Sequence, residues 1–290
     1  MSALYLDNRL VHYEVFGRGQ PVIFLHSWVG SWRYWVSTMD QVSVRYRTYA
    51  LDFWGFGESE RNYQDLGITT FVQMLHGFMD DMGIRKANLV GHGLGGMVAV
   101  RAAQTSPERF TRLLLVATPL EGAILGGLTR RGTFSRLLGS SNPSTTWTKL
   151  IRQIPVDDSE VQQELYEDTD SLSEQVISSV QKSIMETDLR SSLRELDESI
   201  PVLAVYGEKD SIIPPDHAQT YPFLRDDRPY EEGHPPHQLV LFPGANHFPF
   251  LEDSTAFSRM VLDFMMSKKE DLPIAIKEHW RRRVSQHEYL

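Results

Sequence analysis

The sequence predicts an α/β fold built around a parallel sheet. Short apolar runs alternate with segments of helical spacing up to about residue 119 and again after residue 200. This alternation is typical of parallel strands joined by crossover helices. Some apolar runs, such as "PVIFLH" at 21–26, are unbroken, which suits strands that are buried on both faces. The interval between the two parts lacks such runs, and we expect a helical insertion there.

The first part of the chain supplies a hairpin and the first crossover units. Residues 3–17 alternate apolar and polar side chains on either side of Asp7 and Asn8, which predicts a β-hairpin. The expected elements that follow are a strand in 21–26, a strand and glycine-rich loop in 46–59, a helix at 69–82, a strand in 87–93, a helix in 95–107 and a strand in 109–119.

Residues 121–199 form the predicted helical insertion, because 159–196 has helical spacing and many helix formers. The core domain is therefore expected to comprise 1–120 and 200–268. Its second part should contain a strand in 200–210, a short helix at 216–221, a strand in 237–247 and an amphipathic helix at 255–266. Two segments lie outside this scheme. They are a polar, Pro-rich loop at 225–237, whose His234 and His237 we expect to face solvent, and a charged C-terminal extension at 269–290.

Composition excludes several classes of function. The net charge of −9 disfavours nucleic acid and anionic lipid as partners. With no cysteine, the chain has no thiolate nucleophile and no cysteine-ligated metal, and neither a metal nor a cofactor is expected. The N-terminus lacks the pattern of a secretion signal, and no apolar run reaches the roughly 18 residues of a membrane span. A cytoplasmic location is the expectation, and the oligomeric state is not predicted.

The stretch "NLVGHGLGGMVAV" at 88–100 is the most informative, because it combines a strand, a glycine-rich turn and a helix start. Gly91, Gly93 and Gly96 spell the dinucleotide fingerprint G-x-G-x-x-G, but they also fit the nucleophile elbow G-x-S-x-G with glycine replacing serine. A dinucleotide site should open the first crossover unit and place a carboxylate at the end of the next strand. Here earlier central strands precede the motif, and the next strand ends in "ATP" at 117–119, so the elbow is favoured.

Four further motifs resemble those of the α/β-hydrolase family and occur in the family's order. They are the oxyanion loop "VIFLHSWVGSW" at 22–32, the D-x-x-G-x-G-x-S loop "LDFWGFGESE" at 51–60, the acid-bearing strand end "VYGEKDSIIPP" at 205–215 and the histidine loop "FPGANHFPFLED" at 242–253. The resemblance covers about residues 3–266. It implies a doubly wound, mostly parallel eight-stranded sheet flanked by helices, with a helical cap above the catalytic groups.

The resemblance also implies the roles of individual residues. Asp210 would be the acid of a catalytic triad, and His247 would be its general base. The backbone N–H groups of Trp28 and Leu94 would form the oxyanion hole. Gly93 stands at the nucleophile position and departs from the family pattern, because glycine has no side chain. In a serine hydrolase, loss of the nucleophile lowers turnover about a millionfold, which corresponds to about 8 kcal/mol of transition-state stabilisation.

Three residues are predicted to contact a ligand: His26, Ser27 and Trp54. Ser27 stands where the family usually has glycine, and plant hydroxynitrile lyases of the same fold carry a hydroxyl residue there that contacts substrate oxygen. The alternative is a hydroxyl that bonds only to the local backbone. Aromatic side chains from the two flanking loops favour an apolar or aromatic ligand. These side chains are Trp28, Trp32, Trp35, Phe53, Trp54 and Phe56.

Three functions remain open. The first is a family member that binds a small, mostly apolar carbonyl- or ester-like molecule without acyl transfer. The second is an enzyme that uses His247 and Asp210 as a general base, in the manner of relatives with lyase or cofactor-free oxygenase chemistry. The third is a serine hydrolase whose nucleophile has been replaced by Gly93.

Overall fold

A mixed sheet forms the centre of the molecule. The computed structural model describes residues 2–61, 65–125, 159–197, 199–219 and 237–268. Within these residues, eight strands form one sheet in the order β1-β2-β4-β3-β5-β6-β7-β8. The strands are β1 (Ser2–Leu6), β2 (Arg9–Gly17), β3 (Pro21–Leu25), β4 (Arg47–Leu51), β5 (Ala87–His92), β6 (Phe110–Val116), β7 (Val202–Gly207) and β8 (His237–Phe242).

The N-terminal hairpin explains the antiparallel edge of the sheet. Asp7 and Asn8 both have positive φ, at 50° and 61°, which suits a two-residue hairpin turn whose twist matches that of the strands. β1 and β2 pair antiparallel, as do β2 and β4, whereas the pairs from β4 through β3 to β8 are parallel. Every residue of β5 and β7 is buried, as expected for strands covered on both faces.

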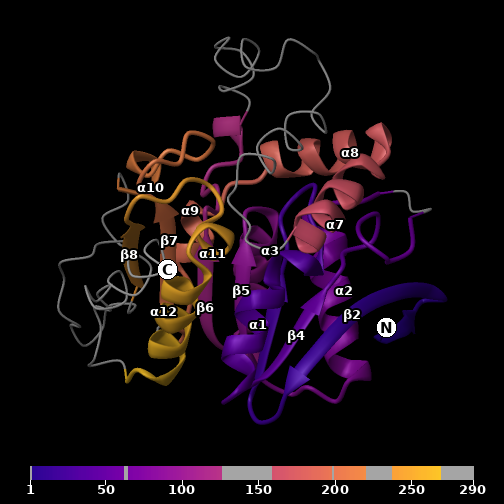
Figure 1. Cartoon of the computed structure of the whole chain (residues 1–290), viewed down its shortest axis with the longest axis horizontal. Coiled ribbons are helices and arrows are strands. Elements are labelled where there is room, and N and C mark those ends of the chain that lie inside the picture. Colours follow the sequence, from indigo (N-terminus) through magenta and orange to yellow (C-terminus); the bar gives the residue numbers. More distant parts are fainter. Residues whose placement is uncertain (1, 62–64, 126–158, 198, 220–236, 269–290) are drawn as a thin grey trace.

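Helices cover both faces of the sheet (Figure 1). α1 contacts α12, and α2 contacts α3. Within the described residues, the segments with helical turns are η1 (Trp32–Trp35), α1 (Val36–Ser43), α2 (Ile68–Asp81), α3 (Leu94–Thr105), η2 (Pro107–Arg109), α7 (Ser159–Asp170), α8 (Glu174–Met185), α9 (Arg190–Arg194), α10 (Asp216–Gln219), α11 (Pro249–Glu252) and α12 (Ser254–Met266).

The predicted fold class is confirmed: the sheet has eight strands, is mostly parallel and is flanked by helices. One prediction about a side chain is wrong. His237 does not face solvent; it begins β8, is only 8% exposed, and its Nε2 lies 3.2 Å from the carbonyl oxygen of Leu193. His234, most of the polar loop at 225–237 and the extension at 269–290 lie outside the described residues.

The strands of the parallel part all point toward one edge, where the loops predicted to carry the site meet. The loops after β3, β4, β5, β7 and β8 all leave the sheet at this edge. α7 and α8 lie at the same end of the molecule, where α7 contacts η1 and α8 contacts α2 (Figure 1). Since ligands of parallel α/β proteins bind at the carboxyl ends of the strands, this edge is the candidate site.

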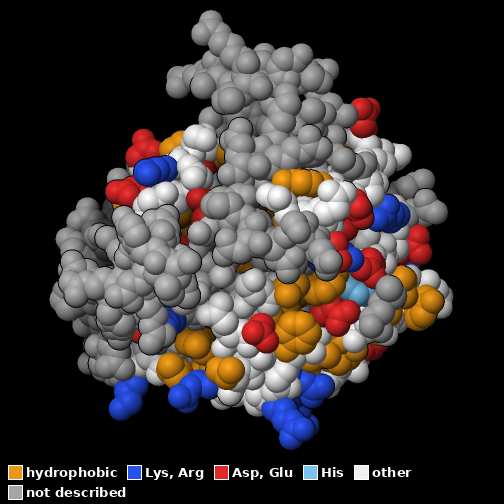
Figure 2. All heavy atoms as spheres, in the orientation of Figure 1, with side chains coloured by type: hydrophobic (Ala, Val, Ile, Leu, Met, Phe, Trp, Pro, Cys, Tyr) orange, Lys and Arg blue, Asp and Glu red, His pale blue; other side chains and the backbone are white. Residues whose placement is uncertain are grey.

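The surface carries charges of both signs. Figure 2 shows acidic and basic side chains distributed over one face rather than separated into two areas. None of the described helices combines the length and the apolar character that a bilayer crossing requires.

Candidate active site

The turn between β5 and α3 has the geometry of a nucleophile elbow. Gly93 has φ +50° and ψ −110°, a combination that glycine adopts readily and other residues rarely. Its N–H donates to the carbonyl of Val116 at 2.9 Å, and its carbonyl accepts the N–H of Met97 at 3.2 Å. The turn is therefore anchored to the neighbouring strand and opens the helix at once.

His247 and Asp210 meet across the sheet edge as a hydrogen-bonded pair. His247 follows β8, Asp210 follows β7, and the distance from Nδ1 to Oδ2 is 2.9 Å. The other oxygen of Asp210 accepts the N–H groups of Ile212 at 2.8 Å and Ile213 at 3.0 Å. Both members of the pair are only 4% exposed. Because Asp210 accepts from Nδ1–H, it selects the tautomer in which Nε2 of His247 is the unprotonated, basic nitrogen.

His92 lies directly beside His247. Their ring centroids are 4.7 Å apart, and His92 is completely buried. Burial, and then the neighbouring imidazole, hold the pKa of His92 well below its usual value. His92 is therefore neutral near pH 7. A positive charge on His247 would then not be repelled by a charge on His92. Phe248 and Phe250 also pack near His92, with ring centroids 5.1 and 5.0 Å away.

His26 joins two of the converging loops. Its Nδ1–H donates to the carbonyl of Ser27 at 2.7 Å, and its Nε2 accepts the N–H of Phe53 at 2.9 Å. Burial lowers the pKa of His26, which keeps the ring neutral and able to make both bonds. In this conformation both ring nitrogens serve the backbone, so the predicted contact of His26 with a ligand stays a prediction.

The aromatic residues of these loops divide between the core and the site edge. Trp35, Phe53 and Phe56 are fully buried; for example, the ring of Phe53 stacks on that of Phe71 with centroids 4.5 Å apart. Trp28 is 8% exposed, and its Nε1–H donates to the carbonyl of Ile177 in α8 at 3.2 Å. Part of the aromatic cluster therefore holds the fold together and is not available to a ligand.

For Trp54 and Leu94, the geometry does not test the predicted roles, which stay predictions. Trp54 is 3% exposed and has the guanidinium of Arg9 over its ring at 5.5 Å. Leu94 is the first residue of α3, where backbone N–H groups lack partners within the helix. Together with Trp28, it would supply the N–H groups of an oxyanion hole. Val29, next to Trp28, has an unusual φ of 62°.

The sequence comparison decides the family. Residues 20–254 match the family described as alpha/beta hydrolase fold. The chain belongs to the α/β-hydrolase fold family. A curated relative, a 2-hydroxy-6-oxo-6-phenylhexa-2,4-dienoate hydrolase from Burkholderia cepacia, is 27% identical over 276 residues, which cover 90% of this chain and 92% of that protein.

Another relative of this α/β-hydrolase-fold protein is longer than the chain. The dihydrolipoyllysine-residue acetyltransferase component of the acetoin cleaving system from Pseudomonas putida is 25% identical over 262 residues, which cover 87% of this chain but 65% of that protein. Among solved structures, a hydrolase from Pseudomonas aeruginosa PA01 has a TM-score of 0.74 at 18% identity, covering 92% of this chain and 98% of that chain. At this identity the structural likeness establishes the fold alone.

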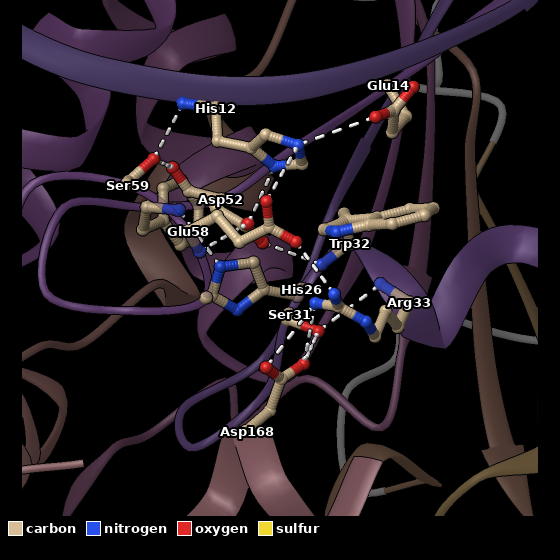
Figure 3. Close-up of polar contacts among 12 residues, drawn as sticks. His12, Glu14, His26, Ser31, Trp32, Arg33, Asp52, Glu58, Ser59 and Asp168 are labelled. Atoms are coloured by element: carbon tan, nitrogen blue, oxygen red, sulfur yellow. Dashed lines mark hydrogen bonds and ion pairs between the residues drawn. The ribbon is translucent and has the colours of Figure 1, made fainter. Parts of the chain in front are cut away.

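A buried polar network, which the sequence did not predict, supports the oxyanion loop of this α/β-hydrolase-fold protein (Figure 3). Asp52, at the end of β4, is completely buried. Its carboxylate accepts the N–H of Trp32 at 2.7 Å and the N–H of Glu58 at 3.0 Å, and it lies 2.9 Å from Nδ1 of His12. Burial alone would lower the pKa of His12, but Asp52, Glu58 and Glu14 together raise it.

The network continues from the oxyanion loop into α7. The Arg33 guanidinium contacts the carboxylates of Glu58 at 2.7 Å and Asp168 at 3.3 Å, and the hydroxyl of Ser31 donates to Asp168 (Figure 3). The same guanidinium contacts the carboxylate of Glu164 at 3.2 Å. Burial raises the pKa of the Asp168 carboxyl, although its bonds to Ser31 and Arg33 oppose this effect. A sequence signal was present only for Asp52, which opens the D-x-x-G-x-G-x-S loop; nothing in the sequence paired Arg33 with α7.

Proposed function

We propose that this α/β-hydrolase-fold protein binds a small, mostly apolar carbonyl- or ester-like molecule beside the elbow and that His247 acts on it as a general base. The observation that carries the proposal is the buried pair of His247 and Asp210, with Nδ1 and Oδ2 2.9 Å apart. A site that only binds a ligand has no evident need for such a base. Asp210 is in turn held by two backbone N–H groups, which orient it toward the imidazole.

The proposed chemistry needs no covalent intermediate. Nε2 of His247 accepts a proton from the ligand, and Asp210 stabilises the imidazolium that results. The negative charge left on the ligand's oxygen would be stabilised by the N–H groups of Trp28 and Leu94. His247 then returns the proton to the leaving or rearranged group. Because Gly93 offers no side chain, the acyl-enzyme route of a serine esterase is not expected.

The expected ligand class follows from the residues near the elbow and from one relative. Trp28 brings an aromatic ring to the site edge from the loop after β3 and is 8% exposed, and such rings favour apolar or aromatic ligands. The relative from Burkholderia cepacia is named for a substrate that has both an oxo and a phenyl group. An aromatic ketone or ester is therefore the first choice of probe.

Gly93 favours a second function, binding without turnover. Glycine at the nucleophile position relieves the backbone strain that a serine would suffer at φ +50°. Native mass spectrometry of the protein purified from its source tests this function. An empty protein there, together with no thermal shift across a library of apolar ligands, would speak against both binding and turnover.

The test of the proposed base is substitution of His247. The parent chain is first assayed on a panel of cyanohydrins, heteroaromatic ketones and aryl esters, and the substrate that it converts fastest is chosen. On this substrate, His247→Ala should lower turnover about 10²–10⁴-fold. Asp210→Asn should lower it in the same direction, because the amide does not stabilise the imidazolium. His217→Ala is a control at a histidine outside the pair. Unchanged turnover in His247→Ala would exclude this residue as the base.

A further inference from the structure

Ser27 and Gly93 face one another across the gap between the oxyanion loop and the elbow. A Cβ added to Gly93 would overlap Oγ of Ser27 and lie 3.1 Å from its Cβ. Carbon atoms in contact normally lie about 3.5–4.0 Å apart. Rotation of the Ser27 hydroxyl would remove the overlap with oxygen but leave the two Cβ atoms too close. A side chain at position 93 and the side chain of Ser27 therefore need the same space.

The backbone on both sides of this contact has little room to move. The carbonyl of Ser27 is held by Nδ1–H of His26 at 2.7 Å, and His26 is held in turn by the N–H of Phe53. On the other side, α3 approaches the loop so closely that a Cβ on Gly95 would overlap the carbonyl oxygen of Leu25. Separating the loop from the helix to admit a larger residue at position 93 would therefore disturb this close packing.

The hydroxyl of Ser27 has no hydrogen-bond partner among the described residues. Ser27 is only 4% exposed, and its side chain makes no hydrogen bond to another residue in the described part of the chain. None of the described residues uses this hydroxyl, so a ligand oxygen can serve as its acceptor. On the other side of the elbow, the ring of His247 is 4.7 Å from that of His92, the residue before Gly93.

We propose that Ser27 supplies, from the loop after β3, the hydroxyl that the elbow lacks: it fills the space of a side chain at position 93 and donates a hydrogen bond to the oxygen of a bound carbonyl or ester. Positions 27 and 93 thus admit one side chain between them. The ligand contact rests on the proposed function, whereas the shared space rests on geometry alone, so the two parts are tested separately.

The shared space is tested by thermal unfolding of Gly93→Ala in two backgrounds. With Ser27 present, Gly93→Ala should lower Tm by about 3–8 °C, because the added Cβ is both strained and overlapped. In the Ser27→Gly background the fall should shrink to that caused by strain alone. Gly83→Ala is the control for positive φ without overlap, since Gly83 has φ +66° and nothing within 4 Å of an added Cβ. An equal fall in Tm from Gly93→Ala in both backgrounds would show that the two side chains do not compete for one space.

Covalent labelling tests chemically whether a hydroxyl can be moved from position 27 to position 93. Gly93→Ser combined with Ser27→Gly should react with a fluorophosphonate at the introduced serine at least about tenfold faster than Gly93→Ser alone, because only the double variant gives the new hydroxyl its space. Equal rates in the two variants would overturn the exchange. If neither variant reacts, the proposal that the Ser27 hydroxyl replaces a hydroxyl at position 93 is also overturned. The Tm experiment still tests whether the two side chains share one space, and His247→Ala still tests the general base.

The ligand contact is tested with Ser27→Ala. This variant should keep or raise the Tm of the parent chain, because none of the described residues hydrogen-bonds to the hydroxyl that it removes. It should bind the aromatic ketone acetophenone about threefold to tenfold more weakly. A Tm that falls by several degrees would assign the hydroxyl a structural role. Equal affinity of variant and parent, or no binding by either, would overturn the ligand contact.

Discussion

At the scale of single residues, the site combines groups that sequence motifs predict with a contact that they do not. The order of the motifs was enough to expect Asp210 and His247 near each other, and Oδ2 of Asp210 lies 2.9 Å from Nδ1 of His247. The overlap between Ser27 and position 93 was not predictable, because it depends on the distance between a loop and a helix start. The solvent-facing prediction for His237 failed because the residue begins a buried strand rather than ending the loop before it.

Asp52 gives the strongest prediction at this scale. Asp52→Ala should lower the free energy of unfolding by about 3–5 kcal/mol, because it leaves the N–H groups of Trp32 and Glu58 and the ring of His12 without their acceptor. Urea unfolding measures the change. Asp40→Ala, at an exposed position, is the control and should stay within about 0.5 kcal/mol of the parent chain. If Asp52→Ala lowered the free energy of unfolding as little as Asp40→Ala, the buried network around Asp52 would not stabilise the fold as proposed.

At the scale of elements, the strands and helices of the core were predictable from hydrophobic periodicity, whereas their tertiary contacts were not. The helix expected at 69–82 is α2, Ile68–Asp81, and the one expected at 255–266 is α12, Ser254–Met266. No periodicity shows that η1 is tied to α7 through Arg33, since the partners are more than a hundred residues apart. Such contacts arise only when the sheet has brought distant loops to one edge.

Removal of Arg33 should loosen α7 selectively. In Arg33→Ala the carboxylates of Asp168 and Glu58 lose a partially buried ion partner. Amide hydrogen exchange in α7 should then become at least several-fold faster, while exchange in β5 should stay unchanged. Arg190→Ala is the matched control, because Arg190 makes ion pairs at an exposed position and such pairs contribute about 0–1 kcal/mol. Unchanged exchange in α7 would show that Arg33 does not hold this helix.

At the scale of the whole molecule, buried histidines make stability depend on pH in opposite directions. The pKa values of His26 and His92 are lowered by burial, so their contributions to stability grow as pH rises through their folded and unfolded pKa values. The pKa of His12 is raised by its carboxylate neighbours. Its contribution is therefore complete below the unfolded value of about 6.5 and is lost as pH rises through the folded value.

The contribution of His12 is isolated by comparing the parent chain with His12→Gln. The difference in unfolding free energy between the two should be largest near pH 5.5 and should shrink as pH rises above about 6.5. Urea unfolding of both proteins between pH 5.5 and 8.5 measures it. A difference that stays constant, or that grows with pH, would show that His12 is not held in its charged form by Asp52.

The central claim is that the site keeps its general base and lacks a covalent nucleophile. Intact mass spectrometry after treatment of the parent chain with an excess of an alkyl fluorophosphonate tests it most directly, with a serine esterase of the same fold as the positive control. We expect the esterase to gain one phosphonyl group and this chain to gain none. A stable adduct on Ser27, or on any other side chain beside His247, would contradict it.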